Sequence, residues 1–193
     1  MFCNWYQRSL TQLSIAIWTK ASPRRKRILS IVIVFIVALA ITAIGTFVPM
    51  DAAQADQISA DLNQTVNTLE SSGALTQYIF GNNFMITLLM FVPIIGPLLG
   101  LFIMFNTGTV VGAIATAGGY PPIMALAALF ITPVAWLEFA AYSTAMAESV
   151  WLFRRLLQGR GIRELRNTTV FISICAVLLV VGAIVEVALI SLV

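Results

Sequence analysis

Residues 28–48 read ILSIVIVFIVALAITAIGTFV, a run of 21 residues without a single charge. An α-helix needs about 20 apolar residues to cross the hydrocarbon core of a bilayer. This run therefore predicts a first transmembrane helix. The alternative is a secretory signal peptide, because Ala53-Gln54-Ala55 has the small-x-small pattern of a cleavage site. However, the apolar region of a signal peptide is normally only about 7–15 residues long.

The composition of the whole chain agrees with a membrane protein. Of its 193 residues, 60% are hydrophobic and 10% are charged, whereas a soluble domain has about 45–50% and about 25%. Histidine is absent and the chain has two cysteines, Cys3 and Cys175, so the usual ligands of zinc and iron–sulfur sites are missing. No phosphate-binding Gly-Lys-Ser/Thr loop occurs. We therefore expect an all-α membrane protein that is not an enzyme, has no cofactor or metal, and binds no nucleic acid.

Charged residues are segregated along the chain. Residues 1–27 hold six bases and no acid, residues 51–70 hold four acids and no base, and residues 154–166 hold five arginines and one acid. Lys and Arg accumulate in cytoplasmic loops. The sequence thus predicts a multi-pass membrane protein. Its N-terminus and its 154–166 loop are expected in the cytoplasm, and its 50–77 segment and C-terminus outside.

The number of spans follows from a long uncharged stretch. Residues 71–137 carry no charge over 67 positions, and they lead from the outside to the cytoplasmic loop, which requires an odd number of crossings. We expect three crossings within residues 78–151, the last of them formed by 123–151. With residues 28–48 and a final span at 168–190, the prediction is five transmembrane spans in a single membrane domain.

Two interruptions within this stretch leave one element too short. They are Pro93-Ile-Ile-Gly-Pro97 and Asn106-Thr-Gly108, and a turn at either place leaves about 12 or 13 residues for one span, against about 20 required. Interrupted segments of this kind are typical of broken helices and re-entrant hairpins. We expect a broken or re-entrant helix in the 81–118 region, with Pro93 and Pro97 as breaks and Pro133 as a further break later.

Two segments outside the bilayer are expected to be amphipathic helices. Residues 1–20 place apolar and aromatic side chains at helical spacing, which predicts an interfacial helix on the inner surface. In the 50–77 segment, one apolar stripe either caps the bundle or docks an extracytoplasmic partner. That stripe includes Ile58, Leu62, Val66 and Leu69. Asn63-Gln-Thr65 also matches a glycosylation acceptor.

Glu138 is the acid expected nearest to the middle of the bilayer, where a charge is costly and requires a partner. The predicted polar core comprises Glu138, Tyr142, Asn82, Asn83 and Asn106. Pro133 frees the carbonyl of Leu129, which Thr132 or Glu138 is able to bond. Two roles remain open for Glu138: a structural hydrogen bond to a neighbouring helix, through Asn82, Asn83 or Asn106, and a proton or solute relay. Glu148 is expected to pair with Arg155 or to reach the inner surface, and Glu186 to anchor at the outer surface.

Close helix packing is predicted from two pairs of glycines, each pair four residues apart. The pairs are Gly96 with Gly100 and Gly108 with Gly112. Such small-xxx-small pairs let helix backbones approach each other in a membrane.

The paired asparagines, the glycine-rich span and the later acid together resemble the stage II sporulation protein M family of prokaryotic membrane proteins. That family shows a paired Asn, an Asn-Gly with a further Gly, and a Pro-His-Gly-x-x-Glu signature. The counterparts here are Asn82-Asn83, Asn106-Thr107-Gly108 with Gly112, and Pro133 with Glu138. Val134 and Ala135 replace the motif His and Gly, and Thr107 is inserted. The resemblance implies a location in a prokaryotic cell membrane. It also implies a membrane scaffold, because such proteins are implicated in holding cell-wall-remodelling partners.

Two functions are therefore carried forward. The first is a non-catalytic scaffold or accessory subunit that works with membrane lipids and other membrane proteins, in a complex or as a homo-oligomer. The second is a permease-like unit that works as an oligomer or with a separate ATPase. An intramembrane enzyme would require paired carboxylates or a Ser/His arrangement, and Glu138 and Glu148 do not lie on one helical face.

Overall fold

The computed structural model describes residues 22–192, except the side chain of Arg163, and within these residues the chain forms seven helices and no strand. The helices are α2 (Pro23–Thr46), α3 (Ala52–Ser71), α4 (Leu75–Met90), α5 (Ile95–Ala117), α6 (Pro122–Ile131), α7 (Pro133–Leu157) and α8 (Gly161–Ile190). The predicted interfacial helix of residues 1–20 lies outside the described residues. The all-α prediction is confirmed for the part of the chain that is described.

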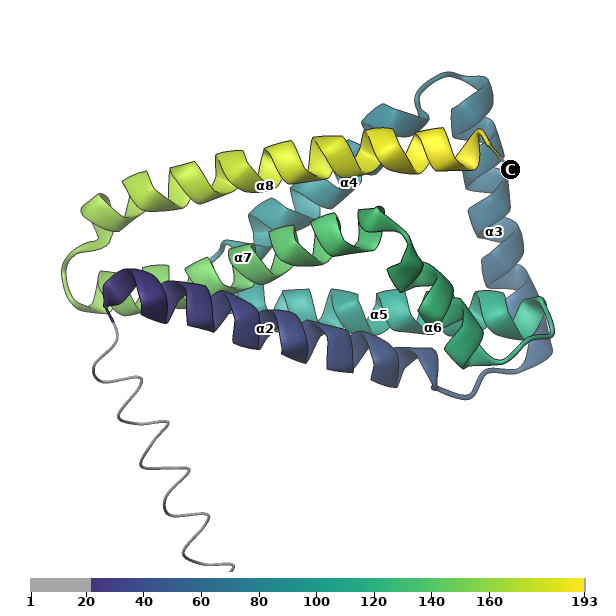
Figure 1. Ribbon diagram of the computed structural model, residues 1–193, viewed down its shortest axis with the longest axis horizontal. Coiled ribbons are helices and arrows are strands. Elements are labelled where there is room, and N and C mark those ends of the chain that lie inside the picture. Colours follow the sequence, from purple (N-terminus) through teal and green to yellow (C-terminus); the bar gives the residue numbers. More distant parts are fainter. Residues whose placement is uncertain (1–21, 193) are drawn as a thin grey trace, which may run out of the picture.

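The helices form a bundle along one long axis (Figure 1). Helices α2, α5 and α8 run in one direction, and α4 and α7 return in the other, while α3 lies across one end. Helix α7 is the central element, since it packs against α8, α2, α4 and α5. Its middle is buried from Ala141 to Ser149 apart from Thr144, which is half-buried. This arrangement brings side chains from four helices to the surface of one central helix.

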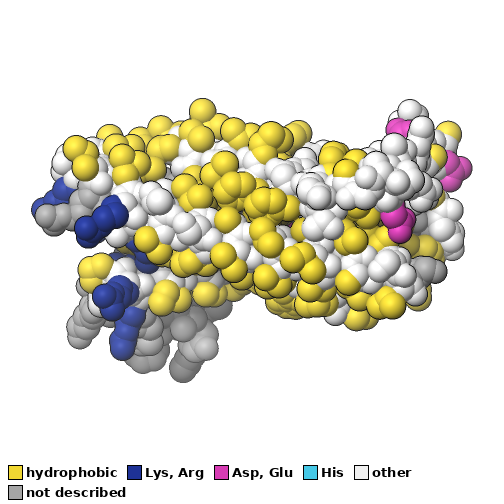
Figure 2. All heavy atoms as spheres, turned by 90° about the horizontal axis from the view of Figure 1, so that it is seen from above, with side chains coloured by type: hydrophobic (Ala, Val, Ile, Leu, Met, Phe, Trp, Pro, Cys, Tyr) yellow, Lys and Arg dark blue, Asp and Glu magenta, His cyan; other side chains and the backbone are white. Residues whose placement is uncertain are grey.

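Charges gather at the two ends of the bundle (Figure 2). Basic side chains occupy the end where α2 and α8 begin, and acidic side chains of α3 occupy the other. We call these the basic end and the acidic end. Among the described residues, α2, α5 and residues 164–190 are long and apolar enough to cross a membrane, and the bent α6–α7 pair gives four if it counts as one span. Helix α4 has 16 residues, or about 24 Å at about 1.5 Å per residue.

The 81–118 region differs from its prediction. Helix α4 ends at Met90 and α5 begins at Ile95, so the interruption at Pro93 is a turn between two helices. Helix α5 continues without a break through Asn106, because the Asn106 side chain donates to the Phe102 carbonyl and does not open the helix. Pro97 lies in the first turn of α5, where a missing N–H breaks no helical bond.

A sharp bend lies instead between α6 and α7, which meet at an angle of 84° and form either a broken span or a re-entrant loop. Thr132 between them has an extended backbone, with φ −78° and ψ 141°, as is favoured for a residue that precedes a proline. The Thr132 hydroxyl donates to the Leu129 carbonyl at 2.9 Å, which is one of the two bonds expected there. The Trp136 indole donates to the Phe130 carbonyl at 2.9 Å, so two freed carbonyls at the bend are satisfied.

Glycines on α5 bring it close to two different helices, to the backbone of α2 and to a side chain of α7. A Cβ on Gly108 would lie 2.1 Å from the Thr42 carbonyl oxygen of α2, and one on Gly112 would lie 2.5 Å from that of Thr46. A Cβ on Gly100 would meet the Met146 sulfur of α7 at 2.3 Å. Gly45 of α2, which the sequence did not single out, completes the α2–α5 contact. The predicted glycines therefore lie at close helix crossings.

Several boundaries move relative to the prediction. The basic segment 154–166 is not a loop: α7 continues to Leu157, a turn follows at residues 158–160, and α8 begins at Gly161. Helix α8 has 30 residues, about 45 Å at about 1.5 Å per residue, and is thus longer than the predicted span 168–190. Within the segment 50–77, the amphipathic helix is α3, and the next helix, α4, already begins at Leu75.

Candidate functional site

A polar cavity of about 300 Å³ lies between α4, α5, α7 and α8. Its polar lining residues are Tyr78, Asn82, Asn83, Thr107, Glu138, Tyr142 and Glu186, and its apolar ones are Ile79, Ile86, Ile103, Met104 and Phe139. Two carboxyl groups thus share one small space with amide and hydroxyl groups. In a bundle as apolar as this one, such a concentration of polar side chains marks a candidate functional site.

Glu138 forms the central interaction of the cavity. Its carboxylate accepts a hydrogen bond from the Asn83 side-chain amide of α4, so Asn83 is the partner among the three asparagines considered. The backbone carbonyl of Asn83 in turn accepts a bond from Thr87 at 2.7 Å, and Thr87 is fully buried. Glu138 is therefore held on the α4 side of the cavity.

Tyr142 and Glu186 complete the polar lining. Tyr142 follows Glu138 by one helical turn and is buried, with 4% of its surface exposed. Glu186 of α8 is expected to anchor at the outer surface, and the structure places it in the lining of the cavity, where it is half-buried. Counting residues along the span gave the depth of Glu186 but not the face of α8 on which it lies.

Asn106 does not belong to this polar core. It is exposed on α5, and its amide bonds to its own helix at Phe102, 2.7 Å away. Asn82 lines the cavity but is itself exposed. The cavity thus gathers four of the five predicted polar residues, together with Thr107, Tyr78 and Glu186. Tyr78 is 50% exposed and lies in the first turn of α4, on the side toward the acidic end, so the cavity reaches the surface of the bundle there.

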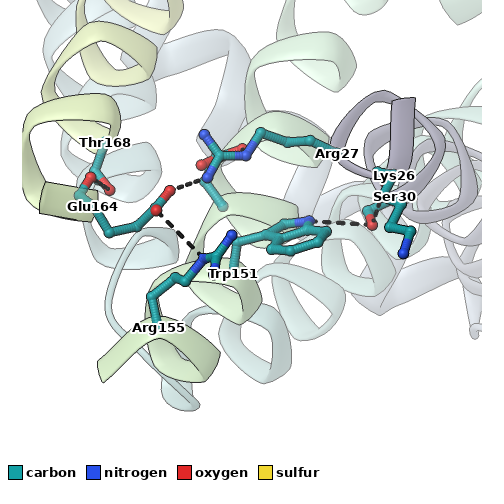
Figure 3. Close-up of polar contacts among 8 residues, drawn as sticks. Lys26, Arg27, Ser30, Trp151, Arg155, Glu164 and Thr168 are labelled. Atoms are coloured by element: carbon teal, nitrogen blue, oxygen red, sulfur yellow. Dashed lines mark hydrogen bonds and ion pairs between the residues drawn. The ribbon is translucent and has the colours of Figure 1, made fainter. Parts of the chain in front are cut away.

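A second polar cluster joins α2, α7 and α8 at the basic end. Arg27 pairs with Glu164 (Figure 3), and its Nε lies 3.2 Å from Glu148. Arg155 lies 3.7 Å from Glu164, and the Trp151 indole donates to the Ser30 hydroxyl at 3.2 Å. The Arg27 guanidinium also stands over the Trp151 and Phe171 rings, 5.7 and 5.4 Å from their centroids. We call Arg27, Glu148, Trp151, Arg155 and Glu164 the basic-end cluster.

This cluster corrects one prediction. Glu148 was expected to pair with Arg155 on the same helix or to reach the inner surface, but it is fully buried and its partner is Arg27 of α2. Glu148 therefore contributes to the contact between α7 and α2. The spacing within α7 placed Glu148 and Arg155 on one face, but it gave no information on the residue that α2 brings to that face.

The turn between α4 and α5 is bonded to α7 close to this cluster. The Ser149 hydroxyl donates to the Val92 carbonyl at 2.6 Å, and a Cβ on Gly96 would lie 3.0 Å from the Ser149 hydroxyl oxygen. This bond ties the turn between α4 and α5 to the central helix α7. Val92 and Ser149 were not singled out from the sequence, because a serine one position from an acid gives no distinct pattern.

The predicted extracytoplasmic stripe lies on α3, which packs mainly on α5 and to a lesser extent on α4. Ile58, Val66 and Leu69 are half-buried, while Leu62 is 40% exposed. Leu62 lies in a groove of about 510 Å³ between α3 and the end of α5. This placement favours capping of the bundle, one of the two predicted roles, and leaves Leu62 accessible to a partner. Among residues 22–192, no group of three or more His, Cys, Asp or Glu is arranged to hold a metal.

The sequence matches the model of a known protein family. The sequence model of the family described as stage II sporulation protein M matches residues 28–190, which include every helix described except the first residues of α2. No curated protein and no solved structure matches the chain.

Proposed function

The chain belongs to the stage II sporulation protein M family, and we propose that it is a non-catalytic integral membrane scaffold or accessory subunit of a larger complex. It works with other membrane proteins or with further copies of itself. In this proposal α2, α4, α5, the α6–α7 pair and α8 each cross the membrane of a prokaryotic cell once. The basic end faces the cytoplasm, and α3 and the C-terminus face the outside.

The observation that supports a scaffold is the dense set of bonds between helices at every level of the bundle. At the basic end Arg27 joins α2 to α7 and α8. In the middle, the Thr42 hydroxyl donates to the Met104 carbonyl at 3.1 Å beside the glycine contact of α2 with α5. Toward the acidic end Glu138 joins α7 to α4. A bundle tied in this way favours a fixed frame over the rocking of half-bundles that transport requires.

The groove between α3 and α5 is the proposed contact surface for a partner. Besides Leu62 it is lined by Asp56, Asn63 and Tyr120, and a buried apolar anchor within a polar rim is typical of an interface. The experiment purifies the chain in mild detergent and identifies its bound proteins by mass spectrometry. Leu62→Asp is expected to release the partner, while Asn67→Asp adds the same charge at another exposed position of α3 and is expected to retain it.

The cavity favours one alternative, a permease-like unit that works as an oligomer or with a separate ATPase. Two carboxyl groups, Glu138 and Glu186, line it together, and transported cations and protons commonly use such groups. The same purified protein in liposomes distinguishes the two functions. Solute or proton flux that is abolished by Glu138→Gln, with no protein bound in detergent, would replace the scaffold by the permease.

A further inference from the structure

A groove of about 570 Å³ opens at the basic end between α2, α7 and α8, beside the basic-end cluster. It has a charged rim and an apolar wall. The rim comprises Arg24, Arg27, Arg155, Glu164 and Asn167, and the wall comprises Pro23, Ile28, Ile31, Trp151, Val170 and Phe171. The scaffold proposal makes no use of this groove.

The rim carries an excess of positive charge. Three arginines line it against one carboxylate, Glu164, while Glu148 lies behind Arg27 and outside the lining. Arg27 and Arg155 are already engaged with these acids. Arg24 is exposed, and within residues 22–192 its side chain forms no ion pair or hydrogen bond. Because a guanidinium has five N–H donors, Arg155 also retains donors beyond those directed at Glu164 and Gln158.

The wall is apolar and open to the surroundings. Ile28 is 62% exposed and Val170 is 56% exposed, and both lie on the membrane side of the rim because they follow the basic residues of α2 and α8 into the apolar part of each helix. The wall also includes Trp151, a residue type enriched at the level of lipid headgroups. The groove therefore offers cationic donors and an apolar surface to one ligand, side by side.

We propose that this groove binds an anionic phospholipid. The phosphate would lie against Arg24 and Arg155, and an acyl chain would lie along Ile28 and Val170. Basic pockets between helices on the cytoplasmic side suit anionic headgroups, and arginine binds phosphate oxygens through paired donors. A free phosphate would use the arginines alone, so the apolar wall favours the lipid. A lipid bound there would contact both α2 and α8 and would add to the interactions between them.

The test titrates the full chain in detergent with phosphatidylglycerol, and in parallel with zwitterionic phosphatidylcholine, and counts bound lipids by native mass spectrometry. Phosphatidylglycerol is expected to bind more tightly. Arg24→Gln is expected to weaken it about tenfold or more, because a charge-assisted hydrogen bond to the phosphate is lost. Arg25→Gln is the matched control, since Arg25 is also exposed at the next position but does not line the groove. The affinity of this variant for phosphatidylglycerol is expected to stay unchanged.

Two further experiments distinguish a phospholipid from free phosphate as the ligand. Val170→Trp keeps every charge and fills the apolar wall at an exposed position, so it is expected to weaken phosphatidylglycerol binding without lowering the melting temperature of the lipid-free protein. Inorganic phosphate is expected to give no thermal stabilisation. Each of four outcomes would overturn the proposal. Arg24→Gln and Arg25→Gln lose the same affinity, or the two lipids bind equally well. Alternatively, Val170→Trp binds phosphatidylglycerol as tightly as the parent, or inorganic phosphate stabilises the protein as much as phosphatidylglycerol does.

Discussion

Gly108 shows at the scale of one residue what holds the centre of the bundle together. It lies where α5 crosses α2, and its missing side chain allows the two backbones to touch: a Cβ there would lie 2.1 Å from the Thr42 carbonyl oxygen and 2.9 Å from the Thr46 nitrogen. Lipid tails are as apolar as a protein core, so helices in a membrane associate largely through such close packing and polar bonds.

The first prediction concerns this contact. Gly108→Ala is expected to destabilise the bundle by about 1–3 kcal/mol, because the new methyl group meets backbone atoms that cannot rotate away. The measurement is thermal unfolding in detergent. Gly81→Ala is the control, since a Cβ on Gly81 of α4 meets nothing within 4 Å and alanine favours a helix by about 0.5–1 kcal/mol over glycine. An equal response of both variants would contradict the close contact.

The second prediction concerns Glu138. If its role is the hydrogen bond to Asn83, Glu138→Gln retains an acceptor oxygen and is expected to unfold near the temperature of the parent. Glu138→Ala leaves the Asn83 amide without an acceptor and is expected to cost about 1–2 kcal/mol. The same unfolding assay in detergent measures both. Glu70→Ala, which removes an exposed acid of α3, controls for loss of charge alone. An alanine variant as stable as the parent would exclude the structural role.

At the scale of elements, the turn between α4 and α5 is the strained part of the described chain. Ile94 has φ of 70°, and no other described residue besides glycine has a positive φ. A β-branched residue is disfavoured in this region. The turn persists because Ser149 bonds the Val92 carbonyl and Gly96 permits close approach to the Met90 carbonyl.

The third prediction uses this strain. Ile94→Gly is expected to raise the free energy of unfolding by up to about 1–2 kcal/mol, because glycine adopts positive φ without a steric penalty. Ile95→Gly, one residue later in the first turn of α5 and similarly exposed, is expected to lower it. Chemical unfolding in mixed micelles compares the two. A loss of stability in Ile94→Gly equal to that in Ile95→Gly would show that the turn stores no strain.

The elements differ in how far their sequence determines them. Apolar runs and charge-free length predicted the main helices, and the stripe on α3 predicted an amphipathic helix, because these are properties of one segment. The face that each helix turns toward its neighbours was harder to predict from the sequence. On α5 apolar residues cover all sides, since lipid and helix neighbours are equally apolar, so no periodicity indicated that Asn106 faces outward. The bend at Thr132 followed from Pro133, whereas its angle depends on packing against α5 and α2.

The candidate site was predictable to the same degree. Glu138 and its pairing with one of three asparagines follow from the depth of each residue along its helix. Glu186 and the pairing of Glu148 with Arg27 do not, since both depend on how α8 and α2 rotate toward α7. Arg27 and Glu148 are separated by more than a hundred positions in the sequence, and no local spacing connects them.

At the scale of the whole molecule, the separation of charge into two ends is the feature that relates the fold to the membrane. The basic end combines the start of α2 with the turn between α7 and α8, and the acidic end carries α3. These parts are far apart in the sequence, and the bundle brings like charges together. Because Lys and Arg are retained in the cytoplasm, this polarity predicts one orientation for the entire chain.

The fourth prediction tests that orientation with single cysteines in a chain in which Cys3 and Cys175 are replaced by serine. Ser71→Cys lies exposed at the end of α3, and Gln158→Cys lies exposed in the turn after α7. A maleimide that cannot cross membranes is expected to label Ser71→Cys in intact cells, and to label Gln158→Cys only after the cells are opened. Five crossings place these sites on opposite sides, because α4, α5 and the α6–α7 pair lie between them. Labelling of both in intact cells would require an even number of crossings between them and would refute the five-span arrangement.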